Sequence, residues 1–153
     1  MRFVVLSLTL LCLGVSVPAQ AEERLAIIVA KTATQGTLDT EQLAQMYLRK
    51  TRFWNDGTRA IPVNLPAAHP LRLAFSRLVL GALPEDQEAY WNEQYFHGIA
   101  PPFVLDSEEA VVQFVATTPG AIGYVNEATV TNSLRVLFYV PQTMSLGEKK
   151  TSP

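Results

Sequence analysis

Two kinds of apolar pattern alternate along this chain. Short continuous apolar runs rich in β-branched residues, which are typical of buried strands, cover Leu25–Ala30, Ala60–Leu65, Ala121–Val125 and Leu134–Val140. Between them, apolar residues recur every three or four positions, as they do on one face of a helix. Helix-start signals precede these amphipathic segments near Asp39, Pro70, Pro84 and Asp106. Strands that alternate with helices predict an α/β fold with a mixed sheet flanked by helices.

The helix-start signals are of two kinds. Asp39 is followed three residues later by Gln42, as in a capping box, and Asp106 and Glu109 repeat this spacing. Pro70 suits the first position of a helix, with the preceding histidine as a mediocre N-cap. On the helix predicted after Asp106, we expect the side chains of Val111 and Phe114 to be buried in the core.

Four aromatic residues crowd the helix predicted after Pro84: Tyr90, Trp91, Tyr95 and Phe96. Trp91 and Tyr95 are four residues apart, so they can stack on one helix face and pack into the core. The alternative is a helix that is wet on its other side and presents Tyr90 and Phe96 to a partner.

Three basic residues follow the first predicted helix: Arg49, Lys50 and Arg52. One interpretation is solvated side chains that complement the negative end of the helix dipole. The other is a patch that binds an anion or a partner.

The first 21 residues have the order of a secretory signal. Arg2 precedes an apolar run, Phe3–Val17, and Ala19-Gln20-Ala21 is a small-x-small cleavage site. A retained membrane anchor is the alternative, but the apolar run is shorter than the ~20 residues that a spanning helix needs. We therefore expect residues 1–21 to be a signal peptide, residues 22–141 to be one exported, periplasmic domain, and residues 142–153 to be a flexible tail.

Composition limits the chemistry of the expected product. Cys12, the only cysteine, lies inside the signal, so the product has no disulfide and no thiol nucleophile. Removing residues 1–21 takes away Arg2 and no acidic residue, which leaves 11 basic against 14 acidic residues, a balance of −3. This charge gives no case for nucleic acid. No later segment is long and apolar enough to span a bilayer, and we expect neither a cofactor nor a metal.

The residues also give little support for an enzyme. His69 and His97 are the only histidines, and neither accompanies a Gly-x-Ser-x-Gly nucleophile motif or a zinc-binding pattern. Glu108 and Glu109 suit the first turn of a helix as dipole partners. An envelope enzyme is therefore the least favoured of three hypotheses.

Three segments carry a family resemblance: "LDTEQLAQMYLRKTRFWNDG", "AIPVNLPAAHPLRLAF" and "TPGAIGYV". They resemble, in this order, a Leu-rich helix leading to a Trp-x-Asp-Gly turn, the strand and helix that follow it, and a Thr-Pro-Gly-x-Ile-Gly-Tyr-Val signature. All three occur in phosphate-type periplasmic binding proteins. From about Leu25 to Val140, the chain thus resembles a short member of the type 2 periplasmic binding protein superfamily, similar to the phosphate-binding subunits of ABC transporters.

The resemblance implies a single periplasmic-binding-protein-like lobe, whereas a full member has two lobes that close on the ligand. The resemblance implies that, in the family, the junction after the second strand carries an Arg, a short gap and then Ser-Gly-Thr at a helix start. Here Leu65 or Pro66 lies near the Arg position, and His69, Pro70 and Leu71 lie near the Ser, Gly and Thr positions. The charge, both hydroxyls and the glycine are absent, and Pro70 removes one N–H donor.

The residues that remain at this junction are His69, Arg72 and the backbone N–H groups from Leu71 onward. Thr32 and Lys31 are further candidate donors. We therefore expect a solute-binding-protein-like domain in which binding of phosphate or another small oxyanion is weak or lost. The alternative is a single-lobe module that binds an envelope or transporter protein.

The signal-peptide prediction can be checked directly. Because the cleavage site ends at Ala21, mass spectrometry of the exported protein should find Glu22 as the first residue. An intact Met1, or a lipid on Cys12, would contradict it.

Overall fold

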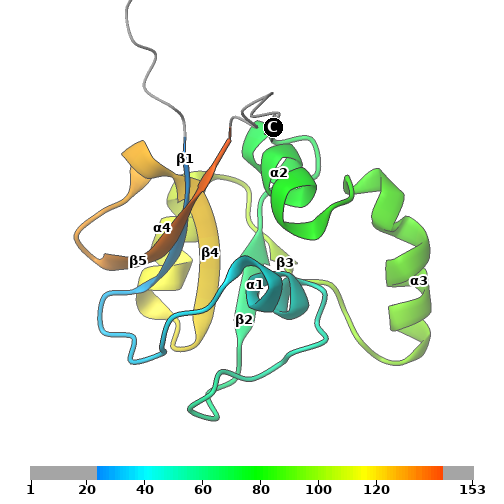
Figure 1. Ribbon diagram of the computed structural model, residues 1–153, viewed down its shortest axis with the longest axis horizontal. Coiled ribbons are helices and arrows are strands. Elements are labelled where there is room, and N and C mark those ends of the chain that lie inside the picture. Colours follow the sequence, from blue (N-terminus) through cyan, green and yellow to red (C-terminus); the bar gives the residue numbers. More distant parts are fainter. Residues whose placement is uncertain (1–23, 143–153) are drawn as a thin grey trace, which may run out of the picture.

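A computed structural model describes residues 24–142, so the predicted signal peptide and all but the first residue of the predicted tail lie outside the described residues. The described part contains a five-stranded sheet in the order β3-β2-β4-β1-β5 (Figure 1). Its strands are β1 (Arg24–Ala30), β2 (Ile61–Asn64), β3 (Phe103–Val104), β4 (Ala121–Asn126) and β5 (Leu134–Pro141). Strand β2 is parallel to β3 and β4, whereas β1 is antiparallel to β4 and β5. The predicted mixed α/β sheet is confirmed, and only the two-residue strand β3 was missed.

Helices connect the strands where the sequence predicted them: α1 (Thr40–Tyr47), α2 (Pro70–Phe75), α3 (Glu88–Phe96) and α4 (Glu108–Thr117). Helix α2 continues without a break into a π-helical turn, η1 (Ser76–Leu80), which ends at Gly81 in the left-handed conformation (φ 70°). Two short 3-10 helices, η2 (Glu85–Gln87) and η3 (Glu127–Thr129), precede α3 and follow β4. No helix among residues 24–142 has the length and apolar character needed to cross a membrane.

Helices cover both faces of the sheet because β4 presents alternate residues to each of them. Gly123 faces α4, and a Cβ at this position would come within 2.7 Å of Val111 Cγ1. The missing side chain therefore allows α4 to pack closely on the strand. On the other face, Tyr124 stacks on Phe75 of α2, with ring centroids 4.1 Å apart, and Tyr47 of α1 packs against Phe75 at 4.5 Å.

Two predictions about α4 need correction. Its N-cap is Ser107, whose hydroxyl accepts the Ala110 N–H, so the capping box proposed for Asp106 and Glu109 is wrong. Val111 is buried as predicted, but Phe114 is only partly buried at the edge of the core. The buried residues of α4 are Val111 and Val115, so Phe114 lies to the side of the helix face that packs on the sheet.

Helix α3 also differs from its predicted packing. None of its residues is buried, and in Figure 1 it stands apart from the sheet. Trp91 meets Tyr90 edge-on at 5.0 Å, in place of the predicted stacking on Tyr95. Tyr90 donates its hydroxyl proton to Leu48 O at 2.7 Å, so this residue ties α3 to the end of α1. Phe96 is exposed, as the alternative interpretation predicted.

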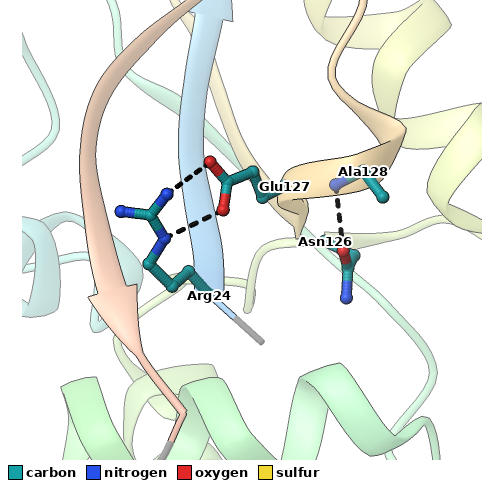
Figure 2. A network of polar contacts seen from close by, with 4 residues as sticks. All are labelled: Arg24, Asn126, Glu127 and Ala128. Carbon is teal, nitrogen blue, oxygen red and sulfur yellow. Dashed lines mark hydrogen bonds and ion pairs between the residues drawn. The ribbon is translucent and has the colours of Figure 1, made fainter. Parts of the chain in front are cut away.

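An ion pair joins the start of β1 to η3, the segment after β4 (Figure 2). Arg24 donates from Nε and Nη2 to the two carboxylate oxygens of Glu127, at 2.8 and 2.6 Å. The Arg24 guanidinium also lies 4.5 Å from the ring centroid of Tyr139. Both charged side chains are about 40% exposed, so water screens the pair, and its contribution to stability is at most ~1 kcal/mol.

Strands β2 and β4 share a very short ladder, which pairs Ile61 with Ala121 and Pro62 with Ile122. Beyond it, buried tyrosine hydroxyls take over the hydrogen bonding. Tyr47 Oη donates to Val63 O at 2.9 Å and lies 3.3 Å from Ile122 O.

The second buried hydroxyl belongs to Tyr124. It accepts the Leu65 N–H and donates to Asn64 Oδ1, both at 3.2 Å. Together, the two hydroxyls provide partners for backbone groups that would otherwise be buried and unsatisfied where the strands separate.

Because burial disfavours the phenolate, it raises the pKa of Tyr124 to about 12 and that of Tyr47 well above its ordinary value. In the unfolded chain, both phenols ionise near pH 10. Their contribution to stability is therefore fully present below pH 10 and, for Tyr124, is lost as the pH rises from 10 to about 12. Chemical denaturation across this pH range should show that fall.

Replacing Tyr124 with Phe should reduce the alkaline loss of stability. At neutral pH, the same change should cost ~1–3 kcal/mol, because the Leu65 N–H loses its buried acceptor. Exposed Tyr95 provides the matched control, since Tyr95→Phe removes a hydroxyl that is not enclosed. An equal alkaline loss in wild type and Tyr124→Phe would contradict the assignment.

Candidate anion site at the start of helix α2

His69 caps helix α2 as predicted. Its backbone is extended (φ −67°, ψ 133°), and its Nδ1 accepts the Leu71 N–H at 3.2 Å. Pro70 follows at the first helical position and has no N–H to offer. The first backbone donor at this helix start is therefore already bonded to a side chain of the same chain.

Leu71 and Arg72, the next two candidates, are buried, with 6% and 8% of their surface exposed. Arg72 Nε donates to Ser76 Oγ at 3.1 Å, one turn further along the same helix. Its guanidinium also acts to lower the pKa of Tyr124, although burial outweighs this effect. Arg72 thus keeps a positive charge in the first turn of α2, but this charge is directed into the core.

Arg72 has no acidic partner: among residues 24–142, no carboxylate lies within 4.0 Å of its guanidinium. A buried charge is usually paired with an opposite charge. Here the Ser76 hydroxyl and the nearby phenol hydroxyl provide polar surroundings for the cation. This role of Ser76 could not be predicted from the sequence, because only the tertiary fold brings the phenol to the same turn.

Thr32 does not lie near His69, Leu71 and Arg72. It follows β1, which runs antiparallel to β4, so it lies at the end of the sheet where β4 begins. His69 follows β2, which runs parallel to β4, and so lies at the end where β4 finishes. Thr32 is exposed and lines a separate depression with Thr58 and Thr118. The structure therefore unites His69, Leu71 and Arg72 and leaves Thr32 at the opposite end.

Among residues 24–142, no three His, Cys, Asp or Glu side chains come close enough to hold a metal ion. The basic cluster predicted after the first helix includes one further arginine, Arg59. Arg59 joins Arg49 and Arg52 because the hairpin around Asp56-Gly57 pairs Phe53 with Arg59. Counting outward from this turn by equal numbers of residues on both arms would have placed Arg59 beside Arg52.

The fold is shared with solved structures of phosphate-binding proteins. A phosphate ABC transporter substrate-binding protein from Clostridium perfringens, with bound phosphate, matches 74% of this chain at 19% identity and a TM-score of 0.62, over 44% of its own length. An ABC-type phosphate transport receptor from Vibrio cholerae matches the same share at 21% identity and the same TM-score, over 45% of its length.

PstS from Borrelia burgdorferi gives a TM-score of 0.58 at 17% identity, over 74% of this chain and 46% of its own. The chain thus spans less than half the length of the solved structures it matches. No protein-family model matches the sequence, and no curated protein sequence matches it either. The resemblance to phosphate-type periplasmic binding proteins is confirmed at the level of the fold.

Proposed function

We propose that this chain is an exported domain with a phosphate-type periplasmic binding fold, in which oxyanion binding is weak or lost. The observation that carries the proposal is the hydrogen bond from the Leu71 N–H to His69 Nδ1, at 3.2 Å. Anions bind at helix starts through free N–H groups. Here Pro70 has none and the next one is capped, while the side chain of Arg72 bonds inward to Ser76.

The rest of the assignment follows from the same comparison. The matched structures are those of substrate-binding and phosphate-transport proteins, which supports a binding protein rather than an enzyme. Their shared ligand makes phosphate the first anion to test. We further propose that residues 1–21 direct the chain to the periplasm, that residues 22–141 form the domain, and that residues 142–153 are a tail.

The expected affinity follows from the donors that are missing. Charge-assisted hydrogen bonds contribute ~1.5–3 kcal/mol each, so losing an arginine and two hydroxyls removes about 4.5–9 kcal/mol. This corresponds to about three to six powers of ten in affinity. Isothermal titration calorimetry should therefore give a dissociation constant for inorganic phosphate of ~1 mM or weaker.

A variant that restores donors makes this prediction sharper. His69→Ser combined with Pro70→Gly introduces a hydroxyl and a free N–H at the start of α2, and should tighten phosphate binding at least tenfold. The His69→Ala variant separates the contributions, because it frees the Leu71 N–H but adds neither a hydroxyl nor an N–H at position 70. Micromolar binding of phosphate by the wild type at neutral pH would contradict the proposal.

A second candidate function is a module that binds an envelope or transporter protein. The observation that favours it is helix α3, in which Tyr95 is 76% exposed and Phe96 is 87% exposed. Large apolar side chains next to each other on a surface helix are typical of binding surfaces, where aromatic residues dominate the affinity. No residue of α3 is buried, so the helix can present these side chains without disturbing the core.

Site-specific photo-crosslinking in the native host tests this second function. A benzoylphenylalanine in place of Phe96 should form one defined adduct with an envelope protein. The same amino acid in place of Arg77, which is exposed on η1, should not form it. Either no adduct from position 96 or the same adduct from both positions would count against this function.

A further inference from the structure

A pocket of about 460 Å³ lies between the loop after α1 and the connector that joins α3 to β3. Three arginines line it, Arg49, Arg52 and Arg59. The connector Gly98–Phe103, which is mostly apolar, lines it as well, together with Ile61 and Pro62 of β2. The pocket therefore combines concentrated positive charge with an apolar surface.

The hairpin between α1 and β2 positions two of these arginines. The Ala60 N–H donates to Arg52 O at 2.9 Å, and Phe53 forms a β-bridge with Arg59, so the two arms of the hairpin carry adjacent arginines. Arg49 reaches the same place from the end of α1, where its Nη1 lies 3.4 Å from Ala60 O. Three cations from one short segment of the chain thus converge on one pocket.

Three features at Arg49 are each unfavourable for the isolated protein. Its φ of 60° is in the left-handed region, which residues other than glycine rarely adopt. Its Nε is enclosed and has no hydrogen-bond partner among the described residues. Partial burial, together with the charges of Arg59 and Arg52, lowers the pKa of its guanidinium.

The described part of the chain offers these three cations no close acidic partner. Within residues 24–142, no carboxylate lies within 4.0 Å of any of the three guanidinium groups. Backbone strain and unpaired polar groups that occur together are typical of sites where a ligand compensates for them.

We propose that this pocket binds a small organic anion that carries a phosphate or carboxylate group on an apolar stem. The guanidinium fork matches both oxyanions in a bidentate geometry, and Arg49 Nε would gain its missing partner. The stem would lie against Ile99, Pro101 and Pro102, which also line the pocket. The volume is within the range of pockets that hold small molecules. This inference concerns a different face from the α2 site and does not rest on the proposed function there.

The experiment compares probes that differ in the apolar stem and in the anionic group. Binding of phenyl phosphate, benzoate and inorganic phosphate to the ¹⁵N-labelled protein is followed by NMR. We expect phenyl phosphate or benzoate to bind at least tenfold more tightly than inorganic phosphate, and to shift the amide signals of Arg49, Ile61 and Ile99. The better of the two identifies the preferred oxyanion.

Variants then separate the pocket from general electrostatic attraction. Arg59→Ala and Arg49→Gly should each weaken binding of the better probe at least fivefold. The second variant should stay folded, because glycine adopts φ 60° without strain. Arg77→Ala removes an exposed arginine that does not line the pocket and should leave affinity unchanged. The proposal is overturned if the apolar stem adds nothing to affinity, or if Arg77→Ala weakens binding as much as the pocket variants do.

Discussion

The rest of this fold depends on how the buried backbone N–H and C=O groups find hydrogen-bond partners where β2 and β4 separate. The parallel ladder between them ends at Pro62 and Ile122, deep inside the molecule. The phenol of Tyr47 bonds to a carbonyl of each strand, and that of Tyr124 bonds to the Leu65 N–H. Without these hydroxyls, the opening between the strands would contain buried polar groups with no partner, which is strongly unfavourable.

This solution determines the surroundings of helix α2. Both tyrosine rings lie under the helix, where Phe75 packs against each of them. Arg72, one turn before Phe75, is drawn into the same buried region and bonds to Ser76. A cation that the sequence places in an ideal position to meet an anion is therefore used inside the core. The start of α2 keeps the geometry of an anion site, but its first backbone donor is capped by His69 and the side chain of Arg72 bonds inward.

The opposite situation occurs at the hairpin between α1 and β2. There, the strained backbone of Arg49 and the guanidinium groups without a close carboxylate lie beside a pocket. Trp54 anchors the hairpin by donating its indole N–H to Gly120 O at 2.9 Å, and so fixes the positions of Arg52 and Arg59. A rigid anchor of this kind is what a preorganised binding site needs, because the cations are held together before any ligand arrives.

Local signals in the sequence determined much of the secondary structure. The four long strands, the capping box at Asp39 and the glycine stop at Gly81 were all predictable, because each depends on neighbours within a few residues. The cap of α4 was misplaced by one residue, since Asp106 and Ser107 are both good N-caps and residue type does not distinguish between them. The two-residue strand β3 was too short to leave a periodic pattern.

The candidate sites were less predictable than the fold, because they depend on contacts between distant segments. The sequence alone determined that the helix start after β2 lacks an arginine, two hydroxyls and a glycine found in the similar family. Only the tertiary structure decided that Arg72 is buried, that Thr32 lies at the other end of the sheet, and that Arg59 joins Arg49. Strand direction and the packing under α2 are not encoded in the spacing of the residues along the chain, whereas the turn signal at Asp56-Gly57 could place Arg59 near Arg52 but not near Arg49.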